Sequence, residues 1–465
     1  MELRIDRQAL VPVVQQIVDA LIGWIRQDAV QPGTRLPSIR QLARENLLSQ
    51  SSVNEACERL VAQGLLASRH GSSFFVAPPP APDHESSGSL RHTDTPRNRS
   101  DFDDGSPWEL KLGEGGLPES WRESDDLGYA IRQVTRTDMA GLFNYSTPLG
   151  LPALRDQLSR RLKQFNIEAD KNLILTTTGA TQGLDLIVRT LLSPGACVVV
   201  ESPGYSSLFD LLRLHRIEML ELPRTPRGPD VEALQSLLAT HRPSALFINS
   251  ACHNPTGSSL APAVAQRLLE LTRQHAVRVI EDDVYADFQN STRTRLAALD
   301  PEVIYLGSFS KTLSSSLRVG FIAAPQPVIA RLAQVKGITS MGSSRFCESV
   351  LASLLANGAY RKLVQRQRQR LGADMEAVLQ VLEDADWEVF GKPAGGLFIW
   401  ARPPFSDYAG LQRLARRFGV LLSSRTAFSP SGADSDWVRI NVAYARDPRA
   451  QAFFRAAARD RPPVF

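Results

Sequence analysis

Hydrophobic residues follow two different spacings along this chain. Up to residue 76 they recur every three or four positions, which predicts helices over residues 13–26, 38–45 and 52–63. Ser52 and Glu55 have the spacing of a capping box at the start of the third helix. Apolar runs at 65–68 and 73–76 then predict a hairpin with a basic, glycine-containing tip. Two helices across a tight break, followed by a hairpin, indicate a winged helix-turn-helix.

Beyond residue 108 the apolar positions instead form continuous runs. These runs are separated by helix-length segments and lie at 173–176, 197–200, 245–248, 277–280 and 303–306. They predict parallel strands that are buried on both faces. Residues 77–107 are poor in aliphatic side chains and rich in Pro, Ser and Asp, as linkers are. We therefore expect a small domain at 1–76, a flexible linker at 77–107 and a large α/β domain at 108–465.

Composition excludes several classes of protein. The 465 residues are 43% hydrophobic and 22% charged, which excludes collagen-like and largely disordered chains. No apolar run reaches the roughly 18 to 20 residues of a membrane-spanning helix, and residues 1–6 lack the apolar core of a signal peptide. We therefore expect a cytoplasmic protein. The four cysteines lie far apart in the sequence, which argues against a disulfide framework and against a zinc site.

Charge does not by itself identify the partner of the small domain. The net charge of +4 permits an anionic partner without requiring one. Residues 1–76 carry eight arginines against seven acidic residues, so a plain three-helix packing module stays open as an alternative. On DNA the third helix would enter the major groove. The side chains expected at the DNA are Arg35, Arg40 and Arg44 at phosphates, Ser51, Ser52 and Asn54 at phosphates or base edges, and Arg69, His70 and Gly71 in the adjacent groove.

One string favours DNA binding over the packing module. Residues 32–43, PGTRLPSIRQLA, closely resemble the DNA-binding domain of GntR-type bacterial regulators. The resemblance covers nearly all of the small domain and implies double-stranded DNA as the partner. The sequence departs from that family at Gln50 and Ser51, where an arginine is common, and at Cys57, where an aromatic residue is common. These departures bear on the DNA sequence that is preferred.

Glycine-rich and polar strings follow the first three predicted strands, at the end where parallel sheets bind ligands. Residues 178–183, TGATQG, open a helix and would offer backbone N–H groups to a phosphate. Tyr205 follows the second strand and could stack on a flat ring, and Asn254 begins a turn after the third. Taken singly, each has a plain structural alternative: a strand-to-helix turn, a packing tyrosine and a β-turn.

Charged residues follow the last two strands. Asp282 and Tyr285 come after the fourth, although the acidic run 281–283 could instead hold magnesium. Lys311, one of only seven lysines, comes after the fifth, with Arg318 seven residues later. Desolvation there would lower the pKa of the lysine amine and favour Schiff-base chemistry. Arg439 lies inside an apolar strand, where its charge requires a carboxylate.

Together and in this order, these strings resemble the fold-type I, pyridoxal phosphate-dependent aminotransferases over roughly residues 110 to 450. The resemblance implies a large α/β domain with a mostly parallel sheet, a smaller C-terminal α+β subdomain, and pyridoxal phosphate as cofactor. The implied roles are Lys311 for the Schiff base, Asp282 for the pyridine nitrogen, Tyr285 and Asn254 for the phenolic oxygen, Tyr205 for ring stacking, Gly179, Ala180, Thr181, Ser308 and Arg318 for the phosphate, and Arg439 for a substrate carboxylate.

Two further positions bear on this resemblance. Tyr145 matches the tyrosine that reaches the partner subunit's phosphate, which implies a homodimer with shared sites. Arg425 stands in the stretch before Phe428 where the family more often has Pro-Gly. This arginine would select an acidic effector, close the pocket, or simply lie exposed at the surface.

A GntR-type winged helix, a long linker and an aminotransferase-like domain together resemble the MocR family of pyridoxal phosphate-dependent bacterial transcription regulators. The resemblance implies a head-to-tail homodimer whose DNA binding is modulated by pyridoxal phosphate and an amino compound at the Schiff-base site. A ligand changes DNA affinity only through its different affinities for the two arrangements. The alternatives are an active aminotransferase with an accessory DNA-binding domain, whose catalytic residues would be Lys311, Asp282 and Tyr285, and a structural DNA-binding protein that has lost its cofactor.

Overall fold

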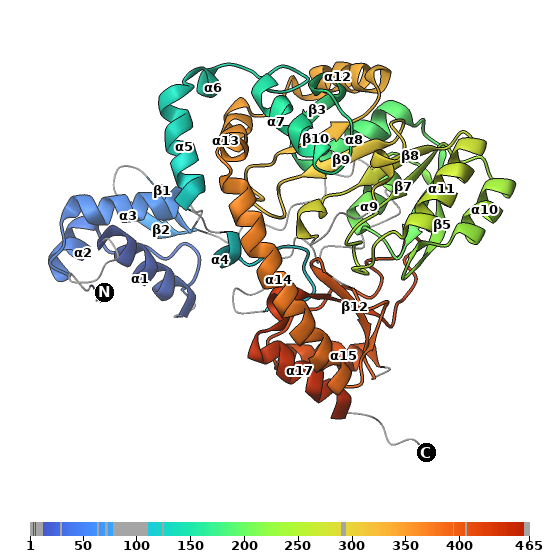
Figure 1. Cartoon of the computed structure of the whole chain (residues 1–465). Helices are drawn as coiled ribbons and strands as arrows, with labels where there is room; N and C mark the ends of the chain where they lie inside the picture. Colours follow the sequence, from blue (N-terminus) through green and yellow to red (C-terminus); the bar gives the residue numbers. More distant parts are fainter. Residues whose placement is uncertain are drawn as a thin grey trace. The chain divides into compact units, whose positions relative to one another are not determined.

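The chain forms two compact units, residues 1–93 and 94–465. The computed structural model describes residues 3, 5, 13–27, 30–62, 65–69, 73–77, 110–122, 125–289, 294–393, 395–404 and 407–459. Each unit has hydrophobic cores of its own (Figure 1). The predicted linker lies almost wholly outside the described residues, so the predicted domain boundaries stay a prediction.

Three helices of the first unit enclose one small core, as the hydrophobic spacing predicts. They are α1 (Val13–Gln27), α2 (Ile39–Glu45) and α3 (Gln50–Ala62). Leu21 of α1, Leu42 of α2 and Leu60 of α3 are fully buried in this core. The Ser38 hydroxyl accepts a hydrogen bond from the Gln41 amide at 3.2 Å and so caps the start of α2.

Helix α3 begins two residues earlier than predicted. The hydroxyl of Ser49, not that of Ser52, accepts the capping bond, from the Ser52 amide at 3.0 Å. Glu55 pairs with Arg59 one turn later at 2.8 Å. The predicted capping box is therefore wrong, because several serines in this stretch offer a hydroxyl and only the turn geometry selects one.

The hairpin of the first unit is also present. Strands β1 (Leu66–Arg69) and β2 (Ser73–Val76) are antiparallel, and Arg35 forms an additional bridge to Phe75. Residues 70–72 and the side chain of Arg69 lie outside the described residues. The predicted DNA contacts of Arg69, His70 and Gly71 therefore stay predictions.

An eight-stranded sheet lies at the centre of the second unit, in the order β3-β10-β9-β8-β7-β4-β5-β6. Strands β9, β8, β7, β4 and β5 pair in parallel, which confirms a mostly parallel sheet. The strand bounds are β3 (Ile174–Thr177), β4 (Cys197–Ser202), β5 (Glu218–Thr225), β6 (Gly228–Pro229), β7 (Ala245–Ile248), β8 (Arg278–Asp282), β9 (Ile304–Ser308) and β10 (Gly320–Ala323).

All five strands expected from the apolar runs exist, but one has an unexpected neighbour. Strand β3 pairs with β10, and β10 runs antiparallel to both β3 and β9. Strands β5, β6 and β10 are present in the sheet although the sequence did not predict them. Strand β5 has mixed polar and apolar residues, so it forms no apolar run. Strand β10 is no shorter than β3 and β7, so its length does not explain why it was not predicted.

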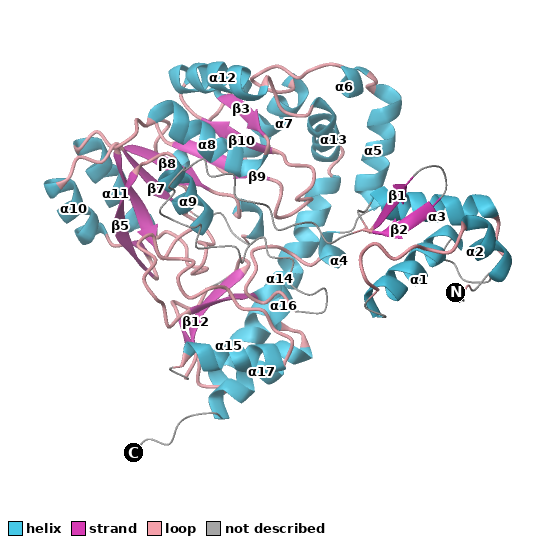
Figure 2. Cartoon of the chain, turned by 180° about the vertical axis from the view of Figure 1, so that it is seen from behind, coloured by secondary structure: helices cyan, strands magenta, loops and turns pink. Residues whose placement is uncertain are grey.

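Both faces of this sheet are apolar because successive strand residues point to opposite sides. Leu246 and Ile248 of β7 belong to one core, and Ala245 and Phe247 belong to the other. Helices cover both faces (Figure 2). One face carries α7 (Pro152–Lys163), α10 (Val231–Thr240), α11 (Pro262–Gln274) and α13 (Arg345–Ala356), and the other carries α8 (Gly179–Leu191), α9 (Ser206–Leu214) and α12 (Gln326–Ser340).

A smaller subdomain follows the long helix α14 (Ala359–Asp384) and confirms the expected C-terminal α+β part. Its antiparallel sheet has the order β11-β12-β13 and packs in a separate core. The elements are β11 (Glu388–Val389), β12 (Phe398–Arg402), α15 (Tyr408–Arg417), β13 (Val438–Asn441), α16 (Val442–Ala445) and α17 (Pro448–Arg459). Residues 110–117 join it through a bridge from Leu110 to Val420.

Three helices lead from that segment into the large sheet: α4 (Glu119–Arg122), α5 (Asp125–Thr137) and α6 (Ala140–Phe143). Within the described residues, no helix combines the length and the apolar character needed to cross a membrane.

Candidate functional site

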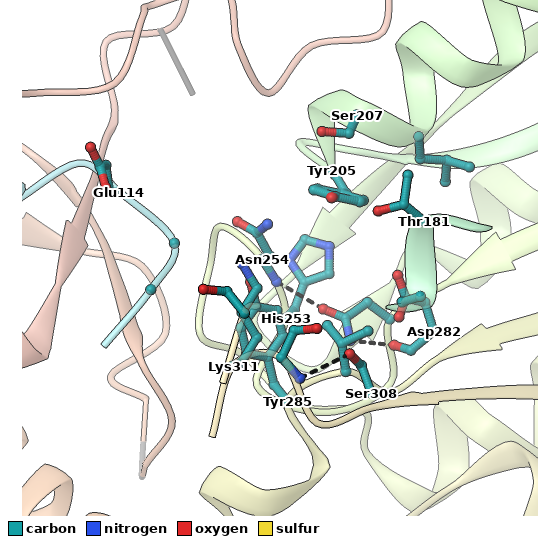
Figure 3. Close-up of a pocket in the computed structure, with 18 of the residues that line it drawn as sticks. Glu114, Thr181, Tyr205, Ser207, His253, Asn254, Asp282, Tyr285, Ser308 and Lys311 are labelled. Atoms are coloured by element: carbon teal, nitrogen blue, oxygen red, sulfur yellow. Dashed lines mark hydrogen bonds between the residues drawn. The ribbon is translucent and has the colours of Figure 1, made fainter. Parts of the chain in front are cut away.

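A cavity of about 800 Å³ opens where the parallel strands end, next to the smaller subdomain. Figure 3 shows side chains from several strand ends converging on it. The structure brings together most of the residues singled out in the sequence. Those that line the cavity are Ala180, Thr181, Tyr205, Asn254, Asp282, Tyr285, Ser308, Lys311, Arg318 and Arg439.

One end of the cavity is built to accept an anion. Helix α8 begins there, and its first residue, Gly179, has a φ of +74°. A Cβ on Gly179 would lie 2.6 Å from Nη2 of Arg318, so only glycine lets this guanidinium lie across the helix N-terminus. The nearby Ser310 hydroxyl is buried without a hydrogen-bond partner. A helix N-terminus, a guanidinium and an unpaired hydroxyl together suit a phosphate.

Asp282 faces the cavity from the end of β8 (Figure 3). Its Oδ1 is buried and has no hydrogen-bond partner. Burial, together with the neighbouring Asp283 carboxylate, raises the pKa of Asp282 to about 7. A backbone hydrogen bond from Val284 and the charge of Lys311 offset this rise only in part, so a ligand that brings a donor or a cation to Oδ1 would satisfy the remaining oxygen.

The two acids beside Asp282 point elsewhere. Glu281 accepts bonds from the amides of Leu296 at 2.9 Å and Ala297 at 2.8 Å. Asp283 accepts from Arg295 Nε at 2.5 Å and from the Tyr305 hydroxyl at 3.0 Å. Among the described residues there is no cluster of three or more His, Cys, Asp or Glu residues suited to a metal ion. The acidic run therefore does not converge on one ion, because side chains alternate along β8.

Arg439 reaches the cavity from β13 and is only 3% exposed. Its Nη1 donates to Asn254 Oδ1 at 2.8 Å, and its Nε and Nη2 donate to the Gly113 carbonyl at 3.1 and 2.6 Å. The rings of Phe398 and Phe428 lie 4.9 and 4.7 Å from the guanidinium carbon. The guanidinium is thus held in one orientation at the cavity wall.

Several cavity residues were not found from the sequence. Asn249 ties the loop after β7 to the end of β8, since its Oδ1 accepts from the Asn254 amide at 2.8 Å and its Nδ2 donates to the Asp282 carbonyl at 2.7 Å. Glu201 lines the cavity and forms a buried ion pair with Arg224. A polar residue directly after an apolar strand was the available signal for Asn249.

The segment before α4 is the second omission. Its glycine-rich string, residues 113–116, lines the cavity through Glu114, Gly115 and Gly116. Across the cavity from the strand ends, Glu114 lies on this segment (Figure 3). The glycine cluster was the available signal, but the string does not follow any predicted strand.

Besides Gly179, which opens α8 beside the lining residue Ala180, two predicted positions of the second unit lie outside the cavity lining. Tyr145 is 80% exposed on the surface between α6 and α7. Arg425 binds the Ser435 carbonyl at 3.1 Å and the Asp436 carboxylate at 2.9 Å, with its guanidinium over the Tyr408 ring. Arg425 is half-buried and does not line the cavity, and its role stays a prediction.

The predicted DNA-facing side chains that are described lie at the surface of the first unit. Arg35, Arg40, Arg44 and Ser51 are exposed, whereas Ser52 and Asn54 are half-buried. Ser52 bonds the Ser49 hydroxyl at 2.7 Å, and Asn54 Nδ2 donates to Glu58 at 2.8 Å. Both bonds lie at the surface, where DNA could compete for them.

Comparison with known proteins identifies both parts of the chain. Residues 109–453 match the family described as Aminotransferase class I and II, and this match spans most of the chain. The chain belongs to the aminotransferase class I and II family. Residues 13–76 match a second family, "Bacterial regulatory proteins, gntR family". The aminotransferase-like domain is therefore fused to a GntR-type helix-turn-helix domain, as predicted.

Three proteins are similar to all or most of this chain. An uncharacterized HTH-type transcriptional regulator of Bacillus subtilis, YisV, is 29% identical, over 97% of this chain and 96% of its own. The 2-aminoadipate transaminase of Thermus thermophilus is 32% identical, over 71% of this chain and 84% of its own. The structure of LysN, alpha-aminoadipate aminotransferase, from Thermus thermophilus superposes with a TM-score of 0.69 and 26% identity, covering 76% of this chain and 92% of that one.

The prediction of pyridoxal phosphate as cofactor is confirmed at the level of this family, and the LysN structure is a complex with N-(5'-phosphopyridoxyl)-L-leucine. The cavity of the aminotransferase-like domain fits that group. It offers an anion cradle at the start of α8, and its lining includes the unpaired Ser310 hydroxyl and the unpaired Asp282 oxygen. A phosphate and a protonated ring nitrogen are the groups that would satisfy these two atoms.

Proposed function

We propose that the protein is a transcription regulator that binds operator DNA through its GntR-type domain and senses pyridoxal phosphate and an amino compound through its aminotransferase-like domain. The observation that carries the proposal is the ligand cavity with its unpaired Asp282 and Ser310 atoms, in a chain that begins with a DNA-binding family domain. A relative of matching length, YisV, bears the name of a transcriptional regulator, which supports the proposal. Because the partner is DNA, we place the protein in the cytoplasm.

The cavity suggests how each residue would hold the cofactor. Lys311 would bind it covalently, Asp282 would pair with its ring nitrogen, and Tyr205 would stack on the ring. Tyr285 and Asn254 would donate to its phenolic oxygen. The phosphate would lie at the start of α8 and receive donors from Gly179, Ala180, Thr181, Ser308 and Arg318.

When bound, pyridoxal phosphate supplies an aldehyde that condenses with primary amines and a ring that withdraws electrons. The chain's own residues then decide which amines are kept. Arg439 would hold a carboxylate of the amino compound, and its fixed orientation on Asn254 and Gly113 makes that site ready before the ligand arrives. Asp282, with its pKa raised to about 7, would become fully ionised beside a cationic ring nitrogen.

A homodimer is part of the proposal. Tyr145 would reach the partner's phosphate, and it lies in a surface rich in exposed apolar side chains. Met139 is 53% exposed, Phe143 77%, Ile338 79% and Met341 56%. Large exposed apolar groups gathered on one surface are typical of a protein interface, which supports a second copy of the chain there. The head-to-tail arrangement of this dimer follows from the MocR resemblance.

An active aminotransferase is the second candidate. The observation that favours it is that Lys311, Asp282, Tyr285 and Arg439 all line one cavity, with none of them replaced. Sustained turnover of an amino donor with a keto acid distinguishes an enzyme from a sensor. A sensor reacts once with the amino compound and then stops.

The deciding experiment measures fluorescence anisotropy on DNA from upstream of the protein's own gene, with and without pyridoxal phosphate, at several salt concentrations. A regulator binds this DNA at least about 1,000-fold more tightly than random DNA, and the cofactor shifts that affinity. Equal affinity for both DNAs, combined with steady transaminase turnover, would support the enzyme instead. A light-scattering mass tests the dimer in the same preparation.

A further inference from the structure

A short segment of the second unit connects the linker to the cavity. We call residues 110–117 the strap. On one side, the Leu110 amide donates to the Gly419 carbonyl at 2.7 Å and the Gly113 amide to the Leu421 carbonyl at 2.8 Å. On the other side, the Asn441 amide donates to the Leu112 carbonyl at 2.8 Å. The strap is thus bonded like an added strand, and it directly follows the chain that leads to the DNA-binding domain.

Inside the cavity the strap touches the two side chains that an amino compound would engage. The Gly113 carbonyl accepts from Nε and Nη2 of Arg439 at 3.1 and 2.6 Å. A Cβ placed on Gly115 would lie 3.5 Å from Nζ of Lys311 and 3.8 Å from Nη1 of Arg439. Any ligand that spans Lys311 and Arg439 therefore lies against the strap.

Dedicated side chains hold the strap in this place. Asn441, which is fully buried, donates through Nδ2 to the carbonyls of Glu114 at 2.9 Å and Gly116 at 2.6 Å. The Ser423 hydroxyl donates to the Gly113 carbonyl at 2.6 Å. A Cβ on Gly113 would lie only 2.2 Å from the Ser423 amide nitrogen, so the approach requires glycine.

We propose that the strap transmits ligand binding at Arg439 to the DNA-binding domain, with Asn441 as the positioning residue that keeps it engaged. The inference rests on the function proposed above and names how that site is regulated. A bidentate carboxylate on Nη1 and Nη2 of Arg439 shares Nη2 with Gly113 and Nη1 with Asn254. The carboxylate is an anion and the stronger acceptor, so it redistributes these bonds and shifts the Gly113 carbonyl.

The proposal also defines the class of effector. An amino compound with a carboxylate engages both Lys311 and Arg439 and so acts on the strap through two contacts. An amine without a carboxylate engages Lys311 alone and leaves the bonds between Arg439 and Gly113 unchanged. The effector is therefore an amino carboxylate, and its carboxylate carries the signal.

A matched pair of probes tests this class. The first is the phosphopyridoxyl adduct of L-leucine, the compound bound in the LysN structure. The second is the corresponding adduct of isoamylamine, which is leucine without its carboxylate. Each is titrated into the full-length apoprotein by calorimetry, and the affinity of each complex for upstream DNA is then measured by anisotropy. We expect the leucine adduct to change DNA affinity by about five-fold or more, and the amine adduct to change it far less.

Substitutions of Asn441 and Ser423, the two residues that anchor the strap, test whether the strap transmits ligand binding. Asn441→Ser keeps an oxygen for the cap at the start of α16 but is too short to reach the strap carbonyls. Ser423→Ala removes one hydroxyl from Gly113. Ser429→Ala is the control, because its hydroxyl bonds only the nearby Ser431 and the Ala433 amide. Asn441→Ser and Ser423→Ala should bind the leucine adduct with an affinity within about three-fold of wild type, but the adduct should no longer change their affinity for DNA. In Ser429→Ala the adduct should still change the affinity for DNA.

Hydrogen exchange of the peptide covering residues 110–117 provides a readout without DNA, and it should change with the leucine adduct alone. The proposal would be overturned if the leucine adduct still changed DNA affinity fully in both Asn441→Ser and Ser423→Ala. It would also be overturned if the two adducts changed DNA affinity equally, or if the protein bound the amine adduct but not the leucine adduct. Failure of both adducts to bind, or of the protein to select its upstream DNA, would instead contradict the proposed function. The two failures are therefore distinguishable.

Discussion

The two units of the chain present their functional side chains in opposite ways. In the first unit Arg40 and Arg44 are exposed on the surface of a small apolar core. In the second unit Arg439 is 3% exposed, and Asp282 has a buried oxygen without a partner. The exposed arginines of the first unit, which we call the DNA face, therefore lower the stability of the fold little. In the cavity, by contrast, polar groups are buried where only a ligand completes their hydrogen bonding. Substitutions on the DNA face should act on binding alone, and substitutions in the cavity on binding and stability together.

The sharpest test of the cavity is Lys311→Ala, which should abolish covalent cofactor binding. The visible absorption band of the loaded protein and the mass gained on borohydride reduction should both disappear. Lys336 is the control, because it is fully buried and burial lowers its pKa to about 8, yet it does not line the cavity. Lys336→Met should keep the band, and a reduced adduct on any lysine other than Lys311 would contradict the assignment.

The second test concerns the cost of burying Asp282, whose pKa is raised to about 7 in the folded chain. The folded apoprotein binds more protons than the unfolded chain between about pH 4 and pH 7, so this carboxyl lowers stability as pH rises through that range. Asp282→Asn has no carboxyl group to titrate at this position. Its free energy of unfolding relative to wild type should therefore rise by on the order of 2 kcal/mol from pH 5 to pH 8.

Urea unfolding of the two apoproteins at both pH values measures the difference. Glu281, whose pKa is also raised to about 7, contributes equally to both proteins and cancels. Pyridoxal phosphate should reduce the pH dependence of the wild type only. If the free energy of unfolding depended on pH identically in both apoproteins, ionisation of Asp282 would not lower the stability of the folded chain.

Gly179→Ala tests the anion cradle with a smaller expected effect. The added methyl would lie 2.6 Å from Arg318 and would push this guanidinium off the start of α8, so cofactor affinity should fall by about ten-fold. Gly195 has a similar positive φ of +81° but nothing within 4 Å of an added Cβ, so Gly195→Ala isolates the backbone strain. Spectroscopic titration should show weaker cofactor binding in the first variant and not in the second.

On the DNA side, Arg40→Ala should weaken binding to all sequences alike and reduce the slope of log affinity against log salt by about 1. Arg59→Ala is the control, because Arg59 is exposed on α3 but pairs with Glu55 and is absent from the predicted contacts. Unfolding midpoints should stay near wild type for both. A salt slope unchanged by Arg40→Ala would mean that this side chain contacts no phosphate.

The smallest effect is expected for Arg425→Ala. Its carboxylate partner Asp436 is 64% exposed, so the pair contributes at most about 1 kcal/mol to stability. Titration with the phosphopyridoxyl adducts of L-leucine and L-glutamate should give the same preference in the variant and the wild type. A changed preference between the two adducts would show that Arg425 helps to select acidic effectors.

Much of the fold and of the cavity could be predicted from the sequence, for identifiable physical reasons. Strands buried on both faces must be apolar throughout, so β4, β7 and β9 appear as continuous runs. Asp282 and Lys311 follow such runs directly, and the ends of parallel strands meet at one edge of the sheet.

What escaped prediction depends on partners distant in the sequence. The place of strand β10 is decided by β3, nearly 150 residues earlier. Gly113 and Asn441 meet in the strap although they lie at opposite ends of the domain. Local patterns carry no information on such pairings.

The pairing of β3 with β10 also sets the order in which the protein becomes functional during synthesis. The anion cradle needs Arg318, at the entry to β10, to reach Gly179, after β3, so it cannot form until that late stretch has left the ribosome. The helix-turn-helix closes through local contacts within its first 77 residues and can fold long before. A growing chain therefore acquires its DNA-binding surface before it can respond to the cofactor.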